Sequence, residues 1–317
     1  MKKPFSCHDL SKGGILITCS SHEGRCKGIV AALEKSPLSN AIVFHYDDVN
    51  DRREEHHSEM IRALEFQGAK VNELIFTESC AVQSLHNNMG ALKKIISLNP
   101  SAPILLDITV FTKRHLLMML RWLDDNGCWD RLFIAYTEPD EYDVSEYVPL
   151  SFGLKSIEQI PGFSACPDMS RPTHLMLFLG YEGDRALAAY EHVQPMCLSI
   201  AIPYPPYKPK WSGRTEQLNK ELLALVGGNS LIRVDAVDPA GTVDAMNKTF
   251  GDPKVRSEYS RIVCPIGTKP QTFGMYCYIR ECEDPPAVLY PAPLRHNHGF
   301  FSHGIGPSWT LKGGETE

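Results

Sequence analysis

Four polar residues follow an apolar run in the first half of the chain, and their types suit a phosphate. These residues are Asp107, Thr109, Thr112 and Lys113. The apolar run 103–106 predicts the end of a buried parallel strand, and the periodic segment 114–123 predicts a helix directly after it. At such a turn, free backbone N–H groups and the helix dipole attract an anion. A lysine beside hydroxyl groups therefore predicts phosphate binding, although these residues could merely cap the helix, with Asp107 or Thr109 as the N-cap.

The second half of the chain repeats this arrangement. An apolar run at 261–266 and a periodic segment at 272–279 again flank a polar turn. The candidate ligand contacts in this turn are Gly267, Thr268, Lys269 and Gln271. Both predicted strands thus lead into a Thr-Lys pair, which indicates two equivalent anion-binding corners.

Polar residues also follow the first predicted strand of each half. The candidate ligand contacts there are Ser20, Glu23 and Arg25 in the first half, and Tyr181 and Glu182 in the second. Glu23 precedes Lys113 by 90 positions. Glu182 precedes Lys269 by 87 positions, so the two halves are nearly in register. Neither turn has the G-x-G-x-x-G fingerprint of a dinucleotide site, and we expect no cofactor.

The loop 203–214 combines aromatic rings with cations. Tyr204 supplies a flat apolar face and Arg214 a positive charge, and a nucleobase with its phosphate would bind to such a pair. Tyr207 and Trp211 add two further rings. A subunit interface has the same composition, so the sequence leaves both interpretations open.

The closing segment 291–309 follows the last predicted strand. If it folds back over the sheet edge, Arg295 and His303 could reach an anion in a cleft. Simple packing of the segment is the alternative.

Two pairs of histidines invite comparison with metal sites. His296 and His298 have a spacing that can bind metal on an extended segment, but no acidic or cysteine partner is near them in the sequence. His56 and His57 are adjacent, and adjacent residues on a helix point about 100° apart. We therefore expect no metal site, and we expect a solvated helix surface around His56 and His57.

Strands and helical segments alternate through both halves, and these elements would bring the polar turns to one edge of each sheet. The predicted strands are 15–19, 41–44, 74–76, 103–106 and 132–136 in the first half, and 175–179, 198–202, 231–234, 261–266 and 287–290 in the second. This alternation indicates parallel sheets with right-handed crossovers. The sequence predicts an α/β protein of two tandem Rossmann-like domains with mainly parallel sheets, related by internal duplication.

We place the first repeat at 14–140, a junction at 141–172, and the second repeat with its closing tail at 173–317. A length of 317 residues fits two domains. A net charge of -6 gives no reason to expect duplex nucleic acid as the main partner. The ten cysteines include no CxxC pair, and no secretory leader or long apolar run is apparent, so we expect a cytoplasmic protein without a membrane partner.

With its hydroxyl-rich first turn and its Thr-Lys turn after the fourth strand, the chain resembles the CRISPR-associated Rossmann fold (CARF) sensor domain. In that family, the two turns line a pocket for cyclic oligoadenylates, usually at a two-fold interface between two domains. The matching positions are Ser20, Ser21, Glu23, Asp107, Thr109, Thr112 and Lys113 in the first half, and Gly180, Tyr181, Glu182, Gly267, Thr268 and Lys269 in the second. The glycine pair that usually precedes Thr-Lys is absent, because Val110-Phe111 and Ile266-Gly267 stand in its place.

The resemblance implies a nucleotide-binding sensor or regulatory module of prokaryotic antiviral defence. Its phosphate-containing ligand would lie between the two halves, its effector would be a separate protein, and a homodimer is possible. A second hypothesis is a metal-independent phosphodiesterase in which Lys113 or Lys269 stabilises the transition state and Glu23, Glu182 or a histidine of the closing segment acts as the base. A third is a non-catalytic assembly subunit. The sequence does not decide whether the chain is an enzyme.

Overall fold

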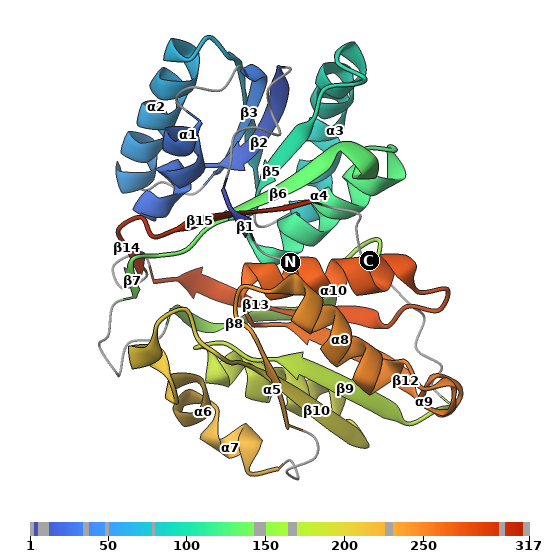
Figure 1. Cartoon of the computed structure of the whole chain (residues 1–317). Helices are drawn as coiled ribbons and strands as arrows, with labels where there is room; N and C mark the ends of the chain where they lie inside the picture. The colour runs from blue at the N-terminus through green and yellow to red at the C-terminus, as the bar shows by residue number, and fades with distance from the viewer. Residues whose placement is uncertain are drawn as a thin grey trace. The chain divides into compact units, whose positions relative to one another are not determined.

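The computed structural model describes residues 3–5, 13–33, 38–47, 51–77, 80–142, 150–163, 170–225, 231–297 and 302–312. The chain divides into two compact units (Figure 1). The amino-terminal unit comprises Lys2–Val144 and Phe301–Glu317, and the carboxyl-terminal unit comprises Ser145–Phe300. None of the described helices is long and apolar enough to cross a membrane.

The amino-terminal unit contains a seven-stranded sheet in the order β1-β15-β6-β5-β2-β3-β4. Its strands are β1 (Lys3–Pro4), β2 (Gly14–Cys19), β3 (Leu38–Tyr46), β4 (Lys70–Phe76), β5 (Ile104–Asp107), β6 (Leu132–Thr137) and β15 (Ser308–Lys312). The five neighbouring strands β4, β3, β2, β5 and β6 are parallel to one another, whereas β15 runs antiparallel to both β6 and β1. Every residue of β2 and β5 is buried, as expected for central parallel strands covered on both faces.

Helices cover this sheet in two pairs. The helices are α1 (Gly28–Ala32), α2 (Asp51–Phe66), α3 (Ala81–Leu98) and α4 (Lys113–Asp125). Helix α1 packs against α2, α3 packs against α4, and the two pairs lie on opposite sides of the sheet (Figure 1). A short ladder of β7 (Glu141–Tyr142) and β14 (Ser302–His303) completes the described part of the unit.

The carboxyl-terminal unit contains a six-stranded sheet in the order β11-β10-β9-β12-β13-β8. Its strands are β8 (Ser151–Gln159), β9 (Thr173–Phe178), β10 (Cys197–Pro203), β11 (Leu231–Val234), β12 (Ser260–Pro265) and β13 (Ala287–His296). Its helices are α5 (Gly183–Val193), α6 (Arg214–Leu218), α7 (Lys220–Leu223), α8 (Pro239–Phe250), α9 (Pro253–Glu258) and α10 (Lys269–Glu281). All strand pairs are parallel except β8–β13.

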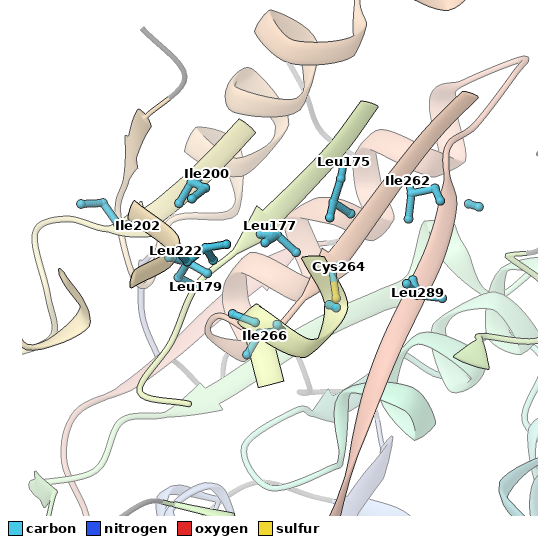
Figure 2. Close-up of a cluster of buried hydrophobic side chains, with 13 residues drawn as sticks. Leu175, Leu177, Leu179, Ile200, Ile202, Leu222, Ile262, Cys264, Ile266 and Leu289 are labelled. Atoms are coloured by element: carbon cyan, nitrogen blue, oxygen red, sulfur yellow. The ribbon is translucent and has the colours of Figure 1, made fainter. Parts of the chain in front are cut away.

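Alternate residues of the central strands build the core of this unit. Figure 2 shows Leu175, Leu177 and Leu179 together with side chains from the neighbouring strands. All three leucines are fully buried. The apolar runs identified in the sequence are thus the strands that the core requires.

The fold class predicted from the sequence is confirmed, because both units are α/β with largely parallel sheets. The five parallel strands have the same spatial order in each sheet, with the third strand at one end and the fifth at the other. Internal duplication itself stays a prediction. One difference concerns the tail, which we expected to remain with the second half. Its strand β15 pairs with β6, because the edge of β13 is already covered by β8.

Candidate functional site

A buried ion pair fills the first turn of the amino-terminal unit. Arg25 donates to both carboxylate oxygens of Glu23, with an Nε–Oε2 distance of 2.9 Å. The same guanidinium donates to the hydroxyl of Tyr136 and to the backbone carbonyl of Thr137. The Ser302 hydroxyl donates a hydrogen bond to the Glu23 carboxylate. Glu23 and Arg25 are only 4% and 2% exposed. This buried ion pair therefore holds the turn in place.

Asp107 lies at the end of β5 in a second buried cluster. Its carboxyl group accepts a hydrogen bond from the Thr18 hydroxyl at 2.9 Å and two from Thr109, one from the N–H group and one from the hydroxyl. The Thr109 hydroxyl in turn accepts from the N–H group of Thr137. Burial raises the pKa of Asp107 to about 6, although these donors and the charge of Arg25 oppose the rise. Asp107 and Thr109 therefore link the ends of β2, β5 and β6.

Thr112 and Lys113 form the corner that leads into α4. Thr112 is the N-cap, and its hydroxyl accepts from the N–H group of His115. Tyr46 accepts a hydrogen bond from the N–H group of Thr112 at 2.9 Å. Lys113 is the first residue of the helix and is partly exposed. The N-cap of α4 is thus Thr112 and not Asp107 or Thr109, and Lys113 lies where an anion would meet the helix amino terminus.

His115, which the sequence did not single out, is buried beneath this corner. Its Nδ1 atom lies 2.8 Å from the Thr112 hydroxyl oxygen. Burial, together with the charge of Arg114, lowers the pKa of His115 to about 3. The ring is therefore neutral at physiological pH.

The first turn also contacts two histidines of α2. His57 lies between Ser20 and Glu73: its Nδ1 atom is 3.0 Å from the Ser20 hydroxyl and its Nε2 atom is 2.8 Å from the Glu73 carboxylate. His56 donates to the backbone carbonyl of Ser21. The sequence analysis expected a solvated surface here. His56 and His57 do point in different directions, but both side chains reach the turn after β2 because α2 packs across this turn.

The carboxyl-terminal unit has a corresponding ion pair in its first turn. Arg185 donates to Glu182 at 2.6 Å and to the backbone carbonyl of Pro291 at 2.7 Å. Its guanidinium lies 5.3 Å from the ring centroid of Tyr290. The Ser151 hydroxyl donates a hydrogen bond to the Glu182 carboxylate. Glu182, a predicted ligand contact, is thus held by residues of its own unit.

The Thr-Lys corner of this unit forms a complete capping box. The Thr268 hydroxyl accepts from the N–H group of Gln271, and the Gln271 side chain accepts from the N–H group of Thr268. Gly267 leaves room for this arrangement, since a Cβ atom there would lie 2.3 Å from the Gln271 amide oxygen. Lys269 is the first residue of α10 and is partly exposed. Lys113 and Lys269 therefore occupy the same helix position in their units.

Aromatic rings and arginines also meet in the carboxyl-terminal unit. The guanidinium of Arg214 lies 4.8 Å from the ring centroid of Tyr181. Arg233 on β11, which the sequence analysis missed, lies 5.5 Å from the ring centroid of Tyr204. Tyr204 is 50% exposed, so its ring is accessible to a ligand. Arg233 gave no signal because it stands within an apolar strand, far from the loop in sequence.

The two predicted residues of the closing segment are both exposed. Arg295 lies on β13 with its guanidinium 4.9 Å from the ring centroid of Phe152, and His303 lies on β14 opposite Glu141. Within the described residues, no group of three or more histidine, cysteine and acidic side chains could hold a metal ion. His298 lies outside the described residues.

Comparisons with solved structures find a similar fold in a known protein. A Type III CRISPR defence DNA nuclease activated by cyclic oligoadenylate matches with a TM-score of 0.56 and 9% sequence identity. The chain shares its fold with the matched part of this nuclease. The match covers 88% of the present chain and 65% of the nuclease, so the chain spans about two thirds of that protein's length.

Other comparisons add little to the assignment. The cytoplasmic domain of a prokaryotic cation chloride cotransporter matches over 88% of the present chain and 95% of that chain, with 10% identity and a TM-score of 0.27. No protein-family model matches the chain. No curated protein is significantly similar to it in sequence.

Proposed function

We propose that the chain is a nucleotide-binding sensor or regulatory module of prokaryotic antiviral defence and that its ligand is a cyclic oligoadenylate. The observation that supports this most directly is the shared fold with a CRISPR defence nuclease activated by that class of compound. The ligand's phosphates would require cations and N–H donors at accessible corners of the sheets. The two Thr-Lys corners have this composition.

Lys113 and Lys269 are the proposed phosphate contacts. Each begins a helix of 13 residues directly after a capping threonine, so its charge adds to the positive end of the helix dipole. Tyr204 with Arg233, and Tyr181 with Arg214, are the proposed base-stacking pairs. Accessibility separates these residues from the buried Glu23–Arg25 pair and from Asp107, to which we assign a supporting role.

Titration calorimetry with cyclic tetra-adenylate and cyclic hexa-adenylate tests this proposal. A charge-assisted hydrogen bond contributes about 1.5–3 kcal/mol, so Lys113→Ala and Lys269→Ala should each weaken binding by about 10- to 100-fold. Lys94→Ala, on the exposed face of α3, is the matched control and should bind like the unaltered protein. Equal affinity in all variants, or no binding of either ring, would contradict the proposal. The expectation of one ligand held by both halves stays a prediction.

The contacts of His57 favour a phosphodiesterase as a second candidate function. Glu73 accepts from the Nε2–H group of His57, so in the neutral ring the basic nitrogen is the Nδ1 atom, which lies 3.0 Å from the Ser20 hydroxyl oxygen. A histidine oriented by a carboxylate is the usual form of a general base. Glu23 and Glu182, considered earlier for this task, are each paired with an arginine.

Chromatography of cyclic tetra-adenylate after incubation with the protein separates the two functions. Turnover that His57→Gln abolishes, with ligand affinity retained, would establish the enzyme. The exposed His86 of α3 provides the matched control, and His86→Gln should leave any turnover unchanged. Binding without turnover leaves the sensor, and an effector would then be sought among separate cytoplasmic proteins.

A further inference from the structure

The sixth strand of each sheet comes from an unexpected part of the chain. In both sheets, one antiparallel strand covers the outer edge of the fifth parallel strand. Strand β8 follows β6 in the sequence, yet it covers β13. Strand β15 follows β13 in the sequence, yet it covers β6 (Figure 1). Each sheet therefore takes its edge strand from the segment that follows the other half of the chain.

The two edge strands pair in the same register. Tyr136 and Tyr290 are equivalent, because each ring lies near the arginine of its first turn, and that arginine donates to the carbonyl of the following residue. Strand β15 places Ser308 opposite Thr137, the residue after Tyr136. Strand β8 places Ile157 opposite Pro291, the residue after Tyr290. Ser308 of β15 and Ile157 of β8 thus occupy equivalent positions beside β6 and β13.

This correspondence extends to a serine six residues earlier in each segment. Ser302 precedes Ser308 by six positions, and Ser151 precedes Ile157 by six positions. Both serines are 8% exposed. Ser302 donates to Glu23, which lies 279 positions away, and Ser151 donates to Glu182. Equivalent serines therefore hold equivalent glutamates.

We propose that the two halves of this chain have exchanged their closing strands, and that Ser302 and Ser151 are positioning residues for the first-turn Glu–Arg pairs. The exchange makes each pair depend on a segment encoded after the opposite half. Without exchange, β8 would cover β6, β15 would cover β13, and each serine would contact the glutamate of its own half. The proposal extends the predicted duplication and does not depend on the ligand.

Engineered disulfides in the full chain test the exchange. The hydroxyl oxygens of Thr137 and Ser308 are 2.9 Å apart, a separation that brings two cysteine side chains within bonding reach. Ser308→Cys with Thr137→Cys should therefore form an intrachain disulfide, identified by peptide mass spectrometry and by migration as a single chain. Ser308→Cys with Pro291→Cys, the pair that unexchanged strands would bring together, should not. Failure of the first pair, a disulfide in the second, or a link between two chains would overturn the exchange.

Urea denaturation tests the positioning role of Ser302. Ser302→Ala should lower the urea midpoint of unfolding in the unaltered background. The effect should be much smaller in a Glu23→Gln background, because Glu23→Gln has already weakened the hydrogen bond that Ser302→Ala removes. Ser302→Thr, which keeps the hydroxyl, should restore the midpoint. Equal effects of Ser302→Ala in both backgrounds, or no rescue by threonine, would overturn the role. Neither measurement involves a nucleotide, so a failed ligand proposal leaves both results interpretable.

Discussion

Asp107 stabilises the fold through its hydrogen bonds, whereas the burial of its negative charge destabilises the fold. The carboxyl group is 1% exposed, and its hydrogen bonds from Thr18 and Thr109 join the ends of β2 and β5. Burial nevertheless raises the pKa from 3.8 to about 6. The folded state therefore binds this proton more tightly than the unfolded state does. Its contribution to stability is complete below about pH 4 and is lost as the pH rises through 6.

Asp107→Asn should remove most of this pH dependence. The shift of about two pH units corresponds to about 3 kcal/mol, so the unfolding free energy of the variant should decline less between pH 4 and pH 7. The amide oxygen can still accept the bonds from Thr109. Urea titrations at four pH values measure the slope. Asp125→Asn on the exposed end of α4 makes the same change without burial and should keep the slope of the unaltered protein. Equal slopes in all three proteins would contradict this account.

At the scale of the element, the contact between α8 and α10 depends on a glycine. A Cβ atom at Gly274 would lie 2.4 Å from the backbone oxygen of Pro239 and 2.7 Å from the Cβ atom of Thr242. Two helices can approach this closely only where one of them has no side chain. Gly90 on α3, by contrast, has open space around its Cα atom.

The same substitution should therefore have opposite effects at these two positions. Gly274→Ala forces α8 and α10 apart and should destabilise the protein by about 1–3 kcal/mol. Gly90→Ala removes backbone freedom from the unfolded chain and should stabilise it by about 0.5–1 kcal/mol. Thermal unfolding of both variants measures the difference. A stabilised Gly274→Ala protein would show that the helix contact tolerates a methyl group.

The elements themselves were predictable from the sequence, because apolar runs and turn residues are local signals. The runs 103–106 and 261–266 became β5 and β12, and the Thr-Lys pairs cap the helices that follow. Contacts of the site that join distant positions gave no such signal. The bond between Ser302 and Glu23 is one example, and the approach of His57 to Ser20 is another, since it depends on how α2 packs across the β2 turn.

At the scale of the whole molecule, strand β15 of the tail belongs to a sheet whose first strand, β1, begins 305 positions earlier in the sequence (Ser308 against Lys3). Strand β15 lies between β1 and β6 and pairs with both. The Trp309 ring nitrogen donates to the Glu138 carboxylate at 2.6 Å. Composition and periodicity cannot identify which of two exposed sheet edges a short strand will join, because both edges offer the same backbone donors and acceptors.

Deletion of residues 298–317 should accordingly damage the amino-terminal sheet and spare the carboxyl-terminal one. Strand β6 would lose its outer partner and Glu23 would lose Ser302, whereas β13 would keep β8. Hydrogen exchange measured by mass spectrometry should show faster exchange in β5 and β6 and unchanged protection in β12 and β13. Deletion of residues 313–317, which follow β15, is the control and should change neither sheet. Lost protection in β13 with an intact β6 would mean that the tail completes its own half, because amide protection follows the hydrogen bonds that each edge strand makes.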